Sequence, residues 1–127
     1  MQISVLLPFK ENFSPDYAGA VSLFINQTSQ NSKYKKNITV YGNTKFKEKL
    51  NTKYKNIEFK KFFFESNKYN FIKKFIEFDT VQKSDLIEIH NRPLYLNKIS
   101  SKINCKFIFH FHNDPLSMTG SKLISER

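Results

Sequence analysis

Apolar residues follow two different periods along the chain. Short runs rich in branched and aromatic residues predict buried strands at residues 3–9, 38–42, 57–63, 85–90 and 105–111. Apolar spacings of three and four residues predict helices at 16–31, 44–50, 67–82 and 94–103, and the opening of another at 120–127. Strands that alternate with helices, without Asn-Gly hairpins, need crossover connections. The pattern therefore predicts an α/β fold: a doubly wound, mostly parallel sheet of about five strands with helices on both faces.

The first predicted helix carries candidate start signals. Ser14 or Asp16 can cap it, and Pro15 suits a first turn because that position needs no amide donor. Pro93 opens the helix at 94–103 in the same way.

Length and composition point to one domain, residues 1–127. The longest apolar runs, at 3–7 and 107–111, fall far short of the roughly 20 residues that a membrane-spanning helix needs. The single cysteine, Cys105, excludes an internal disulfide and a cysteine-cluster metal site. We therefore expect a soluble chain in a reducing cytoplasm.

The positive charge is concentrated in one segment. The chain has a formal net charge of +10, and the segment from Lys33 to Lys74 holds 13 lysines and 3 glutamates, which accounts for the whole excess. Lysine is a hydrated point charge, whereas base-reading sites favour arginine, so sequence-specific nucleic-acid binding is disfavoured. Three interpretations stay open: a solvated surface without a partner, a surface for anionic membrane, and, least favoured, a nucleic-acid surface.

Candidate chemistry lies in the loops after the strands, because open α/β sheets bind ligands beyond the carboxyl ends of their strands. The loop after the first strand ends in Ala18, Gly19 and Ala20 as a helix begins. Small residues and the unpaired amides of a helix start favour a phosphate there. The alternative is that these residues only let the helix pack closely on the sheet.

The loop after the fourth strand begins with His90, Asn91 and Arg92. An imidazole, an amide and a guanidinium at one carboxyl edge can meet a sugar hydroxyl or a phosphate. The alternative is structural, with Asn91 capping the following helix, Arg92 solvated and His90 hydrogen-bonded locally.

The fifth strand ends in His110-Phe-His112-Asn113-Asp114. Side chains alternate along a strand, so His110 and His112 point to one face, roughly 6.6 Å apart. Either His110, His112 and Asp114 bind a metal, or His110 is hydrogen-bonded beneath the site and only His112 emerges. The second interpretation is favoured. Cys105 lies at the opposite end of this strand and has no triad partners.

These loops, taken in order, resemble the N-terminal, Rossmann-like domain of retaining glycosyltransferases of family 4, of the GT-B type. Ala18-Gly19-Ala20 matches the family's Gly-Gly-Ala helix start with one glycine replaced. The His-Asn-Arg-Pro segment at 90–93 and the His-Asn-Asp-Pro segment at 112–115 are similar to those of bacterial cell-envelope and spore-coat members.

The resemblance implies transfer of a sugar from a nucleotide diphosphate sugar to the hydroxyl of a glycan or lipid-linked acceptor. The reaction retains anomeric configuration, needs no metal, and belongs to lipopolysaccharide or cell-envelope polysaccharide synthesis. The implied roles are catalysis for His112, donor-phosphate binding for Ala18, Gly19 and Ala20, and acceptor-side contacts for His90, Asn91, Arg92, Asn113 and Asp114.

The family's second domain, with its Glu-x7-Glu motif and its basic residues for the diphosphate, has no counterpart in this sequence. The chain is therefore expected to be an incomplete N-terminal half, inactive alone. Its lysine-rich segment would hold it at the inner face of the plasma membrane. The alternative function is a non-enzymatic basic module that binds nucleic acid or anionic membrane. A metal hydrolase built on His110, His112 and Asp114 is the least favoured hypothesis.

Overall fold

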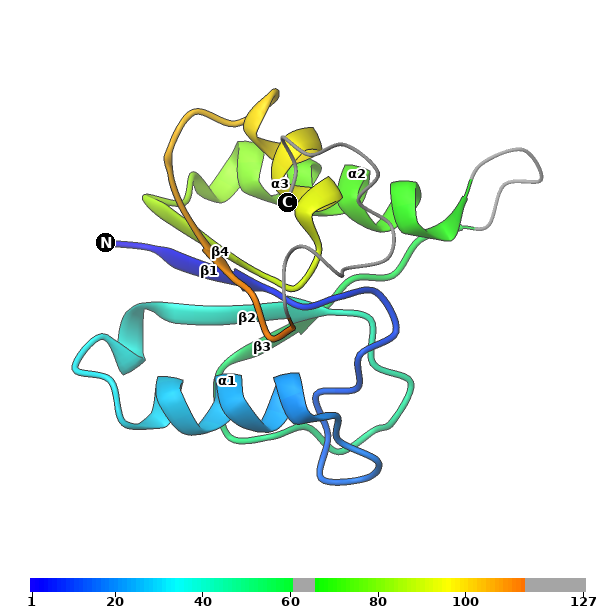
Figure 1. Cartoon of the computed structure of the whole chain (residues 1–127), viewed down its shortest axis with the longest axis vertical. Helices are drawn as coiled ribbons and strands as arrows, with labels where there is room; N and C mark the ends of the chain where they lie inside the picture. The colour runs from blue at the N-terminus through cyan, green and yellow to red at the C-terminus, as the bar shows by residue number, and fades with distance from the viewer. Residues whose placement is uncertain (61–65, 114–127) are drawn as a thin grey trace.

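A computed structural model of the chain describes residues 1–60 and 66–113, and it confirms the predicted fold class. Five parallel strands form one sheet in the order β3-β2-β1-β4-β5 (Figure 1). The strands are β1 (Ile3–Leu6), β2 (Ile38–Gly42), β3 (Tyr54–Asn56), β4 (Leu86–His90) and β5 (Lys106–His110). The helices are α1 (Ala20–Gln30), α2 (Asn67–Gln82) and α3 (Pro93–Ser100), with a short 3-10 turn at Lys35–Asn37.

Helices cover both faces of the sheet, and each face has its own core. Helix α1 lies on one face, and α2 and α3 lie together on the other (Figure 1). Ile25 of α1 packs with Val5 and Val40 in the first core, whereas Phe71 and Phe75 of α2 pack with Ile89 in the second. Alternate residues of β1 and β4 thus serve opposite cores, which explains their nearly continuous apolar sequence.

Helix α1 begins at Ala20, four residues later than the sequence analysis predicts, and neither Ser14 nor Asp16 caps it. The Ser14 hydroxyl instead accepts a hydrogen bond from the amide of Asp16, at 3.1 Å, within a local turn. Tyr17 has a left-handed backbone, with φ of 54°, which a right-handed helix cannot contain. Gly19, in an extended conformation, is the N-cap.

Two predictions between β2 and α2 are wrong. The third strand is Tyr54–Asn56 and not residues 57–63, of which 61–63 lie outside the described residues. Tyr54 pairs with Val40 of β2, and the exposed residues Lys53 and Lys55 lie on either side of Tyr54. Lysines are common on edge strands, where they oppose pairing with another chain. Residues 44–50 form no helix, because their backbone bonds other segments: the amide of Thr44 bonds the Asn56 side chain at 2.7 Å.

The remaining elements agree with the prediction to within a few residues, and α2 has the predicted bounds. Ser66 caps α2 by accepting a hydrogen bond from the amide of Tyr69, at 3.2 Å. The opening of a helix predicted at 120–127 lies outside the described residues. Within residues 1–60 and 66–113, none of the helices has the length and apolar character that crossing a bilayer requires.

The strand order fixes where a ligand can bind. The chain moves outward from β1 through β2 to β3, then returns to β4 on the other side of β1. The connections after β1 and β4 lead to helices on opposite faces of the sheet, and open α/β sheets bind ligands beyond the carboxyl ends of the strands at such a point. The residues beyond His90 and His110 lie at this same edge.

Candidate functional site

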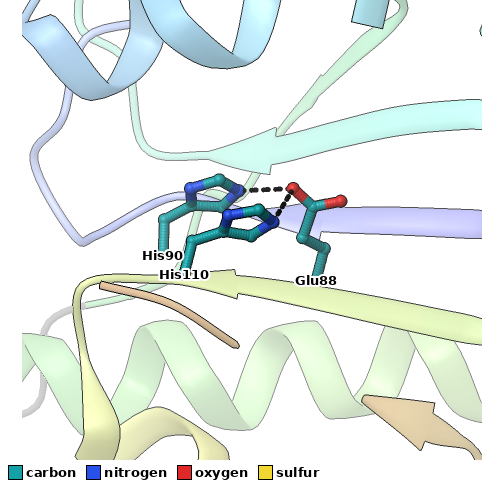
Figure 2. Close-up of side chains that lie close together, drawn as sticks. All are labelled: Glu88, His90 and His110. Atoms are coloured by element: carbon teal, nitrogen blue, oxygen red, sulfur yellow. Dashed lines mark hydrogen bonds and ion pairs between the residues drawn. The ribbon is translucent and has the colours of Figure 1, made fainter. Parts of the chain in front are cut away.

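All three histidines of the chain gather with one carboxylate at the carboxyl ends of β4 and β5. Glu88 and His90 are two positions apart on β4, so they point to the same face of the sheet. His110 is the register partner of His90 on β5, and its ring stacks on the His90 ring with centroids 4.6 Å apart and planes within 2°. Figure 2 shows both rings directed at the carboxylate of Glu88.

Glu88 holds the two stacked rings in place. Its Oε1 lies 2.8 Å from Nε2 of His90 and 3.1 Å from Nε2 of His110 (Figure 2). Burial alone would raise the pKa of the Glu88 carboxyl, but the hydrogen bond from His90 and the nearby charge of His90 and His110 outweigh it and lower that pKa. Glu88 is therefore ionised at neutral pH and accepts hydrogen bonds from both rings.

His112 joins this cluster through His90. Nε2 of His112 lies 2.8 Å from Nδ1 of His90, so Glu88, His90 and His112 form a continuous chain of polar contacts. In the tautomer that has its hydrogen on Nε2, His90 donates to Glu88 and accepts at Nδ1, so Nε2 of His112 is the donor to His90. This arrangement leaves a lone pair on Nδ1 of His112. Partial burial, together with the charges of His90 and His110, lowers the pKa of His112, although Glu11 opposes this effect.

Asn91 fixes the backbone around the cluster. Its backbone is left-handed, with φ of 57°, and turns the chain sharply after β4. Its amide donates to the carbonyl of His110 at 2.8 Å, and its side-chain oxygen accepts from the amide of His112 at 3.3 Å. Asn91 therefore clamps the ends of β4 and β5 together.

Helix α1 reaches the histidine cluster through Phe24. The Phe24 ring makes edge contacts with all three imidazoles, and its centroid lies 5.2 Å from that of His112. Two residues earlier in α1, the hydroxyl of Ser22 donates to the Glu11 carboxylate at 3.0 Å. A side chain at Gly19 would collide with this carboxylate, so Glu11 occupies the space that the glycine leaves open. The start of α1 thus already holds an anion from its own chain, where the helix dipole favours one.

The structure brings together the loops that the sequence analysis singled out. Gly19 is the N-cap of α1, Ala18 precedes it, and Ala20 is the first residue of the helix. Arg92 is exposed, its guanidinium donates to the carbonyl of Asn91 at 2.7 Å, and its backbone, not that of Asn91, provides the N-cap of α3. Asn113 is exposed beside His112.

The structure reverses one expectation about the histidines, and one expected site residue lies outside the described residues. The wholly buried histidine beneath the site is His90, at 0% side-chain exposure, whereas His110 is 37% exposed. The sequence analysis placed His110 in the buried position. Asp114, named there both for the acceptor side and for a metal site, lies outside the described residues.

The sequence analysis missed Glu88, Glu11 and Phe24. Glu88 could have been predicted from the sequence. It lies two residues before His90 on the same strand, so both side chains point to the same face of the sheet. The position of Glu11 could not have been predicted from the sequence, because it depends on an irregular loop in which Lys10 has a left-handed backbone with φ of 72°.

Comparison of the chain with protein-family models, with curated proteins and with solved structures finds no match. The interpretation of the site therefore depends on its own geometry and chemistry.

Proposed function

We propose that the chain is the N-terminal, acceptor-side half of a GT-B glycosyltransferase, which moves a sugar from a nucleotide diphosphate sugar to an acceptor hydroxyl. One observation carries the proposal: the loops after β1, β4 and β5 meet beside the reversal in strand order, with His112 in contact with α1 through Phe24. An open α/β sheet binds its ligand at this location.

The hydrogen bonds around His112 suit it to face the reacting sugar. Glu88 and His90 fix the ring and leave the lone pair of Nδ1 as an acceptor for a sugar hydroxyl. His112 is partly exposed, whereas His90 is buried, so the substrate would contact His112 and not His90. His90 and Glu88 would act as positioning residues.

The donor diphosphate would bind at the start of α1, at Ala18, Gly19 and Ala20. The first-turn amides of a helix favour a phosphate, but the carboxylate of Glu11 is already there. A donor phosphate would therefore have to displace Glu11 from Ser22. The carboxylate is at the end of a flexible side chain, so this displacement requires no change in the helix.

Most of the stabilisation of a departing diphosphate would come from a second, donor-binding domain, since charge development on the leaving group dominates such catalysis. The proposal therefore requires a longer polypeptide or a partner chain that supplies this domain. Asn91, Arg92 and Asn113 would face an acceptor, a glycan or a lipid-linked sugar, from the β4 and β5 side of the crevice. Asp114 would belong to the same side.

The test uses the polypeptide together with the sequence that follows it in its gene. A second α/β domain with a Glu-x7-Glu motif is expected, and the complete enzyme should release nucleotide diphosphate from a sugar donor. His112→Ala should lower turnover by about 100-fold or more, while circular dichroism stays unchanged. Lys106→Ala, at the other end of β5, is the matched control and should retain turnover. Unchanged turnover in His112→Ala, or a gene that encodes no donor-binding domain, would contradict the proposal.

A second candidate function rests on the charge of the segment from Lys33 to Lys74. A basic module that binds anionic membrane or nucleic acid would use these lysines. In the structure they are dispersed: Lys35 precedes β2 at the amino edge of the sheet, Lys47 follows it at the carboxyl edge, and Lys73 lies on α2. This dispersion favours a solvated surface over a single binding face.

The charge hypothesis has its own test. Binding of the chain to anionic phosphatidylserine vesicles and to single-stranded RNA is measured at 20 mM and 200 mM salt. A basic module should bind at low salt and lose affinity steeply at high salt. Lack of association at 20 mM salt would exclude this function.

A further inference from the structure

The cluster of Glu88, His90 and His110 has a property that sugar transfer does not use. Each residue offers one potential ligand atom, and the three atoms lie within 4.8 Å of one another. Both imidazoles present Nε2, the atom most often used by metal-binding histidines, and the carboxylate supplies the third ligand atom (Figure 2).

We propose that Glu88, His90 and His110 bind a first-row divalent transition metal ion, with Zn²⁺ as the preferred probe. Two imidazoles and one carboxylate form a donor set that suits Zn²⁺ and Fe²⁺ and not the oxygen-seeking Mg²⁺ or Ca²⁺. The proposal does not depend on the glycosyltransferase hypothesis, because it concerns ion binding alone.

The geometry requires one local rearrangement. The rings of His90 and His110 are stacked and parallel, so their Nε2 lone pairs run side by side, and the partly exposed His110 ring would have to tilt for one ion to bind both nitrogens. With metal–nitrogen bonds of about 2.0–2.1 Å, ligand atoms around a tetrahedral ion are about 3.3 Å apart. Oε1 of Glu88 already lies 2.8 Å and 3.1 Å from the two ring nitrogens. The ion would take the place of the two shared hydrogens, and the carboxylate oxygen would withdraw to about 3.3 Å from each ring nitrogen. At 22% side-chain exposure, Glu88 has room to do so.

The site is open on one side. A cavity of about 240 Å³ borders Glu88 and His110 and is also lined by Phe24, Thr28 and Ser29 of α1. An ion can therefore approach Glu88 and His110 directly from the cavity, and Nε2 of the buried His90 would complete the site. Three protein ligands beside a solvent-filled cavity leave a fourth coordination position for water or another small ligand, as in zinc sites that are not purely structural.

The outer contacts suit a metal ligand. Histidines that bind a metal through one ring nitrogen donate from the other to a fixed acceptor, which orients the ring. Nδ1 of His90 lies 2.8 Å from Nε2 of His112, so His112 would be that acceptor.

Metal binding would reverse the hydrogen bond between His90 and His112. Without metal, Nε2 of His90 donates to Glu88, and Nδ1 accepts from His112. With metal on Nε2 of His90, the hydrogen of His90 lies on its own Nδ1 and is donated to Nε2 of His112. The hydrogen of His112 then moves to Nδ1 of His112. His110 also changes tautomer, with its hydrogen moving from Nε2 to Nδ1, so each ring keeps the same number of hydrogens. The exposed nitrogen of His112 would thus change from acceptor to donor.

Isothermal titration of the whole chain with Zn²⁺ tests the site. One ion per chain is expected, and Co²⁺ should give visible d–d absorption that Zn²⁺ displaces. Glu88→Gln and His110→Gln should each weaken Zn²⁺ binding by at least about 100-fold, and His112→Ala by about tenfold as an outer contact. Glu77→Gln, an exposed glutamate on α2, is the control and should bind normally.

A second measurement follows the ring nitrogens in ¹⁵N-histidine-labelled protein, which has only three histidine spin systems. Addition of Zn²⁺ should shift His90 and His112 to the opposite tautomer in the folded wild-type chain, with no variant needed. Failure of the wild-type chain to bind Zn²⁺ or Co²⁺, or binding that Glu88→Gln leaves unchanged, would overturn the proposal. Neither result bears on sugar transfer, because no sugar is present.

Discussion

Asn91 and His112 are joined by a hydrogen bond from the backbone amide of His112 to the side-chain oxygen of Asn91, at 3.3 Å. Asn91 makes this contact from a left-handed backbone, with φ of 57°. The bond connects the end of β4 to the residue after β5 that carries the candidate site. The orientation of His112 therefore depends on a backbone conformation that few residues adopt readily.

Two substitutions at Asn91 separate the backbone effect from the side-chain effect. Asn91→Gly keeps the left-handed conformation and removes only one weak hydrogen bond, so it should change the free energy of unfolding by less than about 1 kcal/mol. Asn91→Ala keeps a Cβ in that conformation but lacks the polar side chain that lets asparagine adopt it, so it should cost about 1–2 kcal/mol more than Asn91→Gly. Urea unfolding measures both, and equal stability of the two variants would contradict the expectation.

Gly19 and Glu11 form a second testable pair. In Gly19→Ala the new methyl group expels the Glu11 carboxylate from Ser22 and from the start of α1, at a cost of about 1 kcal/mol. In a Glu11→Ala background the same substitution should cost nothing or stabilise the protein, because alanine restricts the unfolded chain. A double-mutant cycle by urea unfolding gives the coupling. If the effects of Gly19→Ala and Glu11→Ala on the free energy of unfolding were additive, the Glu11 carboxylate would not be held at the start of α1.

The free energy of unfolding should fall in alkaline solution because of Tyr54. Burial raises the pKa of Tyr54 to about 12, although its hydrogen bonds with Thr44 oppose this effect. The folded chain holds the phenol neutral, whereas the unfolded chain ionises it near pH 10. The stabilisation is complete below about pH 10 and is lost as the pH rises toward 12, by about 2 kcal/mol.

Unfolding in urea at a series of alkaline pH values measures this loss. Tyr54→Phe should flatten the pH dependence, whereas Tyr17→Phe, which removes a phenol that is 86% exposed, serves as the matched control. An unaltered slope in Tyr54→Phe would assign the alkaline loss to other groups.

Asp79 near the end of α2 should matter more to stability than its charged neighbour Glu77. Asp79 is buried, at 3% exposure, and accepts hydrogen bonds from both the amide and the hydroxyl of Ser84. Asp79→Ala should cost about 2–3 kcal/mol, because it leaves buried donors unsatisfied. Glu77→Ala breaks only an exposed ion pair with Lys74 and should cost less than about 1 kcal/mol. Similar losses in thermal or urea unfolding would contradict this difference.

Most of the fold could be predicted from the sequence, because in most elements the apolar residues follow the spacing of a helix or a strand. Phe71 and Phe75 recur at helical spacing, and α2 has the predicted bounds. The third strand was misplaced because β3 is an edge strand whose stability comes from pairing with β2, and its own residues are polar. The apolar run that follows it contributes Ile57 and Phe59 to a core without being a strand.

The candidate site was predictable only in part. The carboxyl ends of parallel strands meet at one edge, so the meeting of His90 with His112 follows from the strand assignments. The tautomers, the bond to Glu88 and the clamp at Asn91 depend on side-chain packing that no spacing encodes. The placement of Glu11 depends on the left-handed residues Lys10 and Tyr17, which sequence patterns do not reveal.

The order of the strands also governs how the protein can fold as it is synthesised. Strand β1 is synthesised before the other four described strands, yet one of its two neighbours is β4, so on that side the partner of Ile3 is the distant Leu86. Until β4 is synthesised, β1 can pair with β2 alone, and one of its edges stays open to solvent or to another nascent chain. Assembly of the sheet is therefore dominated by contacts distant in sequence, which slows folding. The histidine cluster requires β5, the last of the five described strands to be synthesised, so its appearance would report completion of the sheet.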